Sequence, residues 1–165
     1  MESITIRFIL NGQSVEDTAL TRWHAIDFLR ERFELSSTRV GCEHGVCGAC
    51  SIRVDSRVVR GCLILAAQLD GTNVETLEGL NASGEIKDLQ EAFHVRNAMQ
   101  CGYCTSGMLM TVQELLLNKS SLNRNEIREH ISGNYCRCTG YEAIVDATEK
   151  VAADRGIRIT KDTPV

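Results

Sequence analysis

The residues of this chain with the clearest chemical potential are its eight cysteines. Four of them lie within residues 41–62, which read GCEHGVCGACSIRVDSRVVRGC, in the spacing C-x4-C-x2-C followed by a more distant fourth cysteine. This is the plant-type ligand spacing of a 2Fe-2S cluster, in which thiolates hold the irons. The first set of predicted ligands is therefore Cys42, Cys47, Cys50 and Cys62.

Two other uses of these cysteines fit the sequence less well. Zinc sites pair short C-x2-C units, or join one such unit to a histidine pair, and residues 41–62 follow neither pattern. Disulfides need an oxidising compartment, whereas the first residues, MESITIRFIL, carry no recognisable signal peptide. Gly41, Gly45 and Gly48 suit a loop whose backbone must approach sulfur closely. We therefore expect a cytoplasmic chain with an iron–sulfur site.

The remaining cysteines form a second set in two short motifs. Cys101 and Cys104 lie in MQCGYCTSGM, and Cys136 and Cys138 lie in GNYCRCTGY. The spacing C-x2-C followed by C-x-C leaves two alternatives open, a second iron–sulfur cluster or a structural zinc site. A chain that already holds one redox cluster has a use for a second, whereas a zinc ion would be chemically idle. We therefore favour the second cluster.

Composition limits the remaining classes of function. A net charge of −4, without a basic run or interleaved basic and aromatic residues, gives no support to nucleic-acid binding. No apolar stretch approaches the ~18 residues of a membrane span. With 165 residues, 43% of them hydrophobic, one or two small domains are expected. Domains of this size often rely on a metal centre for stability.

The first half of the chain predicts an α+β unit. Residues 3–10 alternate between apolar and polar side chains, and Asn11-Gly12 is a strong hairpin signal. Thr21 is expected to cap a helix that ends near Phe33, with Trp23 in the core. The predicted strands are residues 3–10, 13–19, 51–54, 57–59 and 73–77. Residues 63–69 are expected to form a helical turn or a strand, and the whole order fits a β-grasp arrangement.

The second half of the chain predicts a helical bundle, because its apolar residues recur with a period near 3.6. The polar segment 78–84 suggests a boundary between domains 1–78 and 79–165. Predicted helix starts are Ser83, Asn123 with Glu126, and Thr139 with Glu142.

Two further expectations concern the surface of the second half. The apolar segment 108–117 is longer than the apolar face that one helix of a small bundle requires. We therefore expect a partner protein to cover part of it. Residues 154–165 are polar and end in the only proline, so they are expected to form a loose tail or an arm on a partner.

The ordered combination of GCEHGVCGAC, Cys62, QCGYCTSGM and GNYCRCTGY resembles the small iron–sulfur subunit of the molybdenum hydroxylases, the xanthine oxidase and carbon monoxide dehydrogenase family. The likeness covers residues 3 to about 152 and includes all eight cysteines. It implies an N-terminal plant-type ferredoxin-like domain and a C-terminal four-helix domain, each with one 2Fe-2S cluster. Ser106 replaces a proline that is common in the family. Tyr135 replaces a leucine and would place a hydroxyl beside the second cluster.

The resemblance also implies partners. A large subunit would carry molybdopterin, as its cytosine dinucleotide, and a medium subunit would carry FAD, in a dimer of heterotrimers. Single electrons would pass from molybdenum through the second cysteine set, then through the first set, to FAD. Gln100 and Cys138 are expected to approach the pterin. We expect no catalytic residue in this chain, and an N-heteroaromatic substrate, with carbon monoxide, an aldehyde or a purine as alternatives.

Two functions from other classes remain as alternatives. A stand-alone ferredoxin would not need the second domain. A protein-interaction module stabilised by zinc would not need the cysteine spacing of the first loop. His44 lies inside that loop, but four cysteines already complete the ligand set, and a Rieske site needs two histidines. His44 is therefore expected to face solvent.

Overall fold

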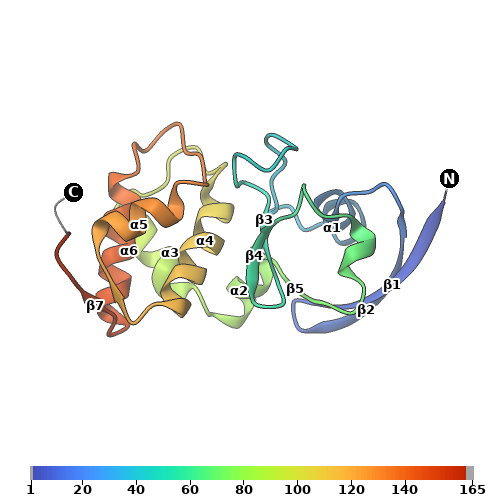
Figure 1. Cartoon of the computed structure of the whole chain (residues 1–165), viewed down its shortest axis with the longest axis horizontal. Coiled ribbons are helices and arrows are strands. Elements are labelled where there is room, and N and C mark those ends of the chain that lie inside the picture. Colours follow the sequence, from blue (N-terminus) through green and yellow to red (C-terminus); the bar gives the residue numbers. More distant parts are fainter. Residues whose placement is uncertain (1, 163–165) are drawn as a thin grey trace.

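The structure is a computed structural model that describes residues 2–162. A sheet unit lies at the N-terminal end of an elongated molecule, and a helical unit lies at the other end (Figure 1). The strands are β1 (Ser3–Leu10), β2 (Gln13–Leu20), β3 (Ser51–Val54), β4 (Arg57–Arg60), β5 (Asn73–Glu75), β6 (Ser121–Leu122) and β7 (Arg158–Ile159). The helices are α1 (Ala25–Phe33), α2 (Leu77–Ser83), α3 (Lys87–Val95), α4 (Thr105–Asn118), α5 (Arg124–Ile131) and α6 (Glu142–Asp154), with a 3-10 turn η1 (Ala66–Leu69).

The sheet unit is built from two tight hairpins. Its strand order is β2-β1-β5-β3-β4, with β1 parallel to β5 and the other neighbouring pairs antiparallel. Asn11-Gly12 joins β1 to β2, and Asp55-Ser56 joins β3 to β4. All four of these residues have positive φ, as the two-residue turns that match strand twist require. The predicted α+β fold class is confirmed, and β5 ends two residues earlier than expected because Leu77 begins α2.

Helix α1 covers one face of the sheet with aromatic residues. Phe28 is fully buried and lies 5.4 Å, centroid to centroid, from the edge-on ring of Phe33. Trp23 packs against the same core, as expected. The predicted cap at Thr21 is wrong, because its amide donates to the carbonyl of Glu2 and extends the β1–β2 ladder. The helix begins instead after His24.

Helix α4 is the central element of the molecule. It contacts α2, α3 and α5 within the helical part and also strands β3 and β4 of the sheet. Residues 106–113, 115 and 116 are all buried, whereas Leu117 is exposed. The expectation that a partner covers part of this apolar helix is wrong for residues 108–116, because the chain's own sheet covers the face that the bundle leaves free.

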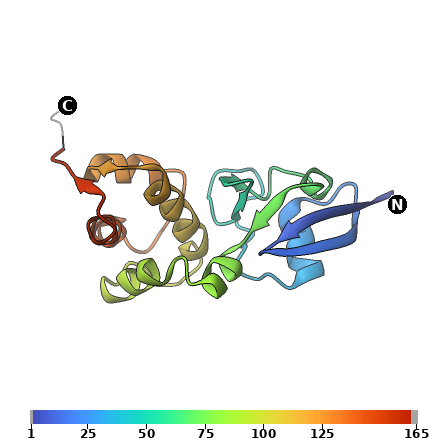
Figure 2. The same ribbon diagram turned by 90° about the horizontal axis from the view of Figure 1, so that it is seen from below.

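The polar segment that suggested a domain boundary forms helix α2. The chain crosses from the sheet to the bundle through this helix (Figure 2). Leu80 is buried with Ile86 and Met110, so the crossing carries a small core of its own. The predicted cap at Ser83 is wrong, because its hydroxyl donates to the carbonyl of Leu80 at the end of α2.

A buried arginine also joins the two units. Arg53 on β3 donates to both carboxylate oxygens of Glu85, at 2.7 and 2.9 Å, and to Glu75 at 2.7 Å. The guanidinium holds the pKa of Glu85 below its usual range. Gln113 on α4 donates to the same carboxylate and accepts from Arg155, which follows α6. This network ties the sheet to three segments of the bundle.

The C-terminal part of the described chain is paired rather than loose. Strand β7 runs parallel to β6, and the amide of Thr160 donates to the carbonyl of Leu122 at 2.8 Å. Asp162 accepts from the amide of Asn125 at 3.0 Å. The predicted loose tail is therefore wrong for residues 157–162, and Pro164 lies outside the described residues. Among residues 2–162, none of the helices combines the length and the apolar character needed to cross a bilayer.

Helix α5 begins with the predicted capping box. The side chain of Asn123 accepts from the amide of Glu126, and the Glu126 carboxylate accepts from the amide of Asn123, both at 2.9 Å. The predicted start at Thr139 is wrong by two residues, because α6 begins after Tyr141, whose amide donates to the Thr139 hydroxyl.

Asn123→Ala should therefore lower the free energy of unfolding by about 1 kcal/mol, because it leaves helix amides without a partner. Urea unfolding of the cluster-loaded chain measures this loss. Glu129→Ala, an exposed change later in the same helix, is the control and should have little effect. Equal stability of the Asn123 variant and the control would contradict the prediction.

Candidate iron–sulfur sites and the contact between them

The first cysteine set is assembled by a loop and a hairpin. Cys50 directly precedes β3, and Cys62 follows β4 after one intervening residue. The antiparallel register opposes Ser51 to Arg60, and the amide of Gly61 donates to the carbonyl of Cys50 at 3.1 Å. This pairing brings the sulfur atoms of Cys50 and Cys62 to 3.4 Å.

The irregular loop before β3 supplies the other two thiols of this set. The amide of Cys47 points at the sulfur of Cys42, 3.4 Å away. Donation by the amides of Cys47 and His44 lowers the pKa of the Cys42 thiol to about 6. Burial raises the pKa of Cys50 to about 11, because a charged thiolate is poorly solvated there. Positive metal ions would supply the stabilisation that the buried thiolate lacks.

The second cysteine set is assembled at the ends of helices. Cys104 occupies the position before α4, and Cys136 lies in the loop between α5 and α6. Burial, followed by the neighbouring thiol of Cys136, raises the pKa of Cys104 to about 12. The thiol of Cys138 adjoins that of Cys101, which raises the pKa of Cys138. Cys101 and Cys138 are exposed, so this set opens to the surface.

Hydroxyl groups surround Cys136. The Thr139 hydroxyl lies 3.1 Å from its sulfur, and the Tyr141 hydroxyl accepts from its amide at 2.8 Å. Burial opposes ionisation of Cys136, but hydrogen bonds from Thr139, Cys138 and Cys104 together outweigh it and lower the pKa of this thiol. The predicted hydroxyl of Tyr135 is not among these contacts, and its side chain is exposed.

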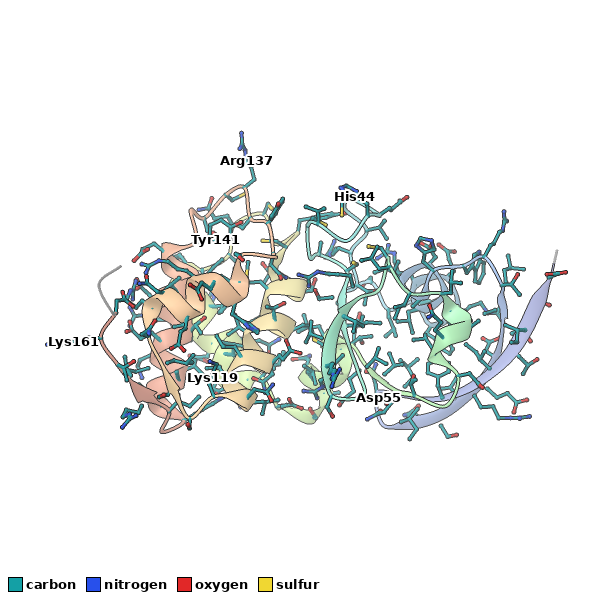
Figure 3. The ribbon with its side chains drawn as sticks, viewed as in Figure 1. His44, Asp55, Lys119, Arg137, Tyr141 and Lys161 are labelled. Atoms are coloured by element: carbon teal, nitrogen blue, oxygen red, sulfur yellow. The ribbon has the colours of Figure 1, made fainter. Side chains whose placement is uncertain are left out.

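Both sets suit a 2Fe-2S cluster in the type of donor that they offer, because each consists of cysteine sulfurs brought together from loops. Among residues 2–162, no group of three or more His, Cys, Asp or Glu side chains has the geometry to hold a single metal ion. His44 is exposed, and its ring nitrogen approaches the carbonyl of Cys42, as expected for a residue that is not a ligand. His44 and Arg137, one from each cysteine loop, lie on the same side of the molecule (Figure 3).

Comparison with known proteins assigns the same chemistry to both units. Residues 8–79 match the family described as 2Fe-2S iron-sulfur cluster binding domain, and residues 76–149 match the family described as 2Fe-2S binding domain. Caffeine dehydrogenase subunit gamma of Pseudomonas sp. (strain CBB1) is 46% identical over 92% of this chain and 93% of its own length. The chain belongs to the small iron–sulfur subunits of the molybdenum hydroxylases.

Two further members of this family have similar length. The nicotine 6-hydroxylase small subunit of Paenarthrobacter nicotinovorans is 45% identical over 88% of each chain. The crystal structure of quinoline 2-oxidoreductase from Pseudomonas putida 86 aligns with a TM-score of 0.88 and 42% identity, over 95% of this chain and 99% of that one. This iron–sulfur subunit is therefore a component of an oxidoreductase complex.

In this molybdenum hydroxylase subunit, the two cysteine loops touch directly. The amide of Tyr135, next to Cys136 of the second set, donates to the carbonyl of Cys47 in the first set at 2.8 Å. The hydroxyl of Tyr103, between Cys101 and Cys104, donates to the carbonyl of Val40 at 2.5 Å. The sequence pattern signalled neither contact, because 88 residues separate Cys47 from Tyr135 in the chain.

The predicted pterin contacts lie at the open edge of the second set. Gln100 and Cys138 are both exposed. Within residues 2–162 the Gln100 side chain has no hydrogen-bond partner, and α3 ends before it at Val95. Gln100 therefore does not cap that helix, and its amide is available to another molecule.

Ser106, one of the two departures from the family pattern, is buried in the first turn of α4. Its hydroxyl has no hydrogen-bond partner among the described residues. A buried, unpaired hydroxyl costs stability, so Ser106→Ala should raise the free energy of unfolding by about 1 kcal/mol. Chemical denaturation measures the gain. Ser132→Ala, which removes a hydroxyl that donates to the carbonyl of Glu129, is the matched control and should give no gain.

Proposed function

We propose that this chain carries single electrons from a molybdopterin site on a large subunit to FAD on a medium subunit. The ligands are the two cysteine sets, one in each of the domains 1–78 and 79–165. When bound, each 2Fe-2S cluster accepts and releases one electron at a time. The observation that carries the proposal is the direct contact of the two loops, in which the amide of Tyr135 donates to the carbonyl of Cys47.

The exposure of the two sets supports a direction of electron flow from the second set to the first. The second set faces outward through Cys101 and Cys138, so an electron donor reaches it without crossing the protein. The first set is more enclosed, with Cys50 and Cys62 each 2% exposed. We assign the entry of electrons to the second set and their exit to the first.

Apolar side chains beside each set support two separate partner surfaces. Val46 and Leu63 lie exposed at the first set, and Leu63 is 62% exposed although it directly follows a buried cysteine. Met99, Tyr103 and Tyr135 are exposed beside the second set. Exposed apolar groups that gather at functional loops are typical of protein interfaces. We assign the first surface to the medium subunit and the second to the large subunit.

The substrate that we propose is an N-heteroaromatic compound, oxidised on the large subunit. The names of three relatives, which refer to caffeine, nicotine and quinoline, support this class. The proposed assembly is a cytoplasmic dimer of heterotrimers, with molybdopterin cytosine dinucleotide as the molybdenum cofactor.

Anaerobic reduction by substrate tests this function. The complex purified from cells that express all three subunits should contain about four irons and four sulfides per small subunit, two of each per cluster. Caffeine, nicotine and quinoline serve as probes, and at least one of them should bleach the visible absorbance of both clusters. The isolated chain should show no bleaching with any probe. Bleaching of the isolated chain, or a flavin-free and molybdenum-free native complex, would overturn the proposal.

Gln100→Ala should slow the reduction of the clusters by substrate, because the side-chain amide both donates and accepts hydrogen bonds at the proposed pterin edge. Both cluster spectra should remain, since Gln100 is exposed and is not a cysteine ligand. Stopped-flow absorbance measures the rate. Glu91→Ala, an exposed change in the preceding helix α3, is the control. A rate equal to that of wild type would remove Gln100 from the proposed contact.

A further inference from the structure

Asn134 is a buried polar residue that touches the neighbours of both cysteine sets. It is 1% exposed and lies two residues before Cys136. Its amide nitrogen donates to the carbonyl of Gly48, which lies between Cys47 and Cys50, at 3.2 Å. Its amide oxygen accepts from Arg60, which lies two residues before Cys62, at 3.1 Å. One side chain therefore joins the segments that carry four of the cysteines.

The chemistry of these contacts permits only one orientation of the amide. Arg60 is a pure donor and needs the oxygen of Asn134, whereas the Gly48 carbonyl is a pure acceptor and needs the nitrogen. Thr111 on α4 also donates to the amide oxygen, at 3.1 Å. A carboxylate in place of the amide would keep the contacts with Arg60 and Thr111 but would face the Gly48 carbonyl with an oxygen.

The backbones of the two loops pack closely against each other beside Asn134. A methyl group added at Gly48 would lie 2.7 Å from the carbonyl oxygen of Gly133, which itself accepts from Arg60 at 2.8 Å. Immediately after Asn134, the amide of Tyr135 donates to the carbonyl of Cys47. This hydrogen bond provides a short through-bond path from one cysteine set to the other. Asn134 is the residue directly before its donor, Tyr135.

We propose that Asn134 is a positioning residue that holds the two clusters at the separation and orientation needed for electron transfer between them. It does so by anchoring residues 47–50 to residues 133–136, which preserves the hydrogen bond between Tyr135 and Cys47. This inference rests on the proposed ligand sets but assigns a function to a residue outside them.

The test uses the full chain in its purified complex, with both clusters loaded. Asn134→Asp removes the donor to Gly48 and nearly preserves shape, and Asn134→Leu removes all of these hydrogen bonds. Two properties are measured, the splitting of the electron paramagnetic resonance lines when both clusters are reduced, and the rate of electron equilibration after flash reduction. Both variants should lose splitting and equilibrate more slowly, while iron and sulfide contents and the spectrum of each cluster stay as in wild type. Asn118→Asp, at the exposed end of α4, should behave as wild type.

A second variant keeps the test decisive if the changes at Asn134 prevent assembly. Thr111→Val removes one donor to the Asn134 oxygen with little change in shape, and a smaller loss of splitting is expected. Wild-type splitting and rate in the loaded Asn134 variants, or in Thr111→Val where those do not assemble, would overturn the inference. A wild-type chain that binds only one cluster would instead contradict the proposed function.

Discussion

Replacing Cys62 by serine should remove one cluster and leave the other. Cys62 is buried, with its sulfur 3.4 Å from that of Cys50. Serine supplies a harder and less acidic oxygen than the thiolates that iron–sulfur clusters favour. Iron content should fall from about four to about two per chain, because each cluster contains two irons.

The matching change in the second set is Cys104→Ser, which should remove the other cluster. Each variant should lose one of two paramagnetic signals on reduction and keep the other, since the two sets are assembled by different elements. Iron analysis and spectroscopy of the two variants provide the measurement. Loss of the same signal in both variants would show that the ligand sets are divided incorrectly.

Gly107→Ala should separate the sheet from the bundle and disturb the first cluster. A methyl group at residue 107 would lie 2.1 Å from the carbonyl oxygen of Gly48, in the loop between two predicted ligands. Alanine favours a helix over glycine by up to about 1 kcal/mol. Overpacking of this kind costs typically about 1–3 kcal/mol, and here the obstacle is backbone rather than a flexible side chain. The clash should therefore outweigh the gain in helix propensity.

Urea unfolding of the cluster-loaded chain should show a net loss of stability in Gly107→Ala, and the spectrum of the first cluster should change. Thr105→Ala, in the same turn of α4 but with a partly exposed side chain, is the control and should preserve that spectrum. A Gly107 variant as stable as wild type, with an unchanged first cluster, would mean that the close approach of α4 to the cysteine loop does not restrain the site.

Hairpins and the capping box were predictable because each depends on a few consecutive residues. Asn11-Gly12 adopts the positive φ angles of its turn, and Asn123 with Glu126 satisfies two helix amides without help from distant elements. The hydroxyl-based caps expected at Ser83 and Thr139 failed because a hydroxyl both donates and accepts hydrogen bonds, and therefore pairs with whichever group the local chain presents. Ser83 closes the preceding helix, and Thr139 turns toward Cys136.

The surroundings of α4 were not predictable from its own sequence. An apolar helix surface indicates that something covers it, but the covering element is chosen by packing between distant segments. Here the cover is strands β3 and β4, which precede α4 by more than 40 residues and against which it packs. The same holds for residues 158–160, whose polar composition gave no sign that they pair with β6.

For this protein, the sequence alone determined the fold class and the family and predicted the two cysteine sets, because ligand spacing and hydrophobic periodicity are local properties of the chain. The tertiary structure alone decided how the two sets meet. The hydrogen bond from Tyr135 to Cys47, the close approach of Gly107 to Gly48 and the contacts of Asn134 join residues far apart in the sequence. Such contacts form only when sheet and bundle pack together, so no spacing within either cysteine motif encodes them.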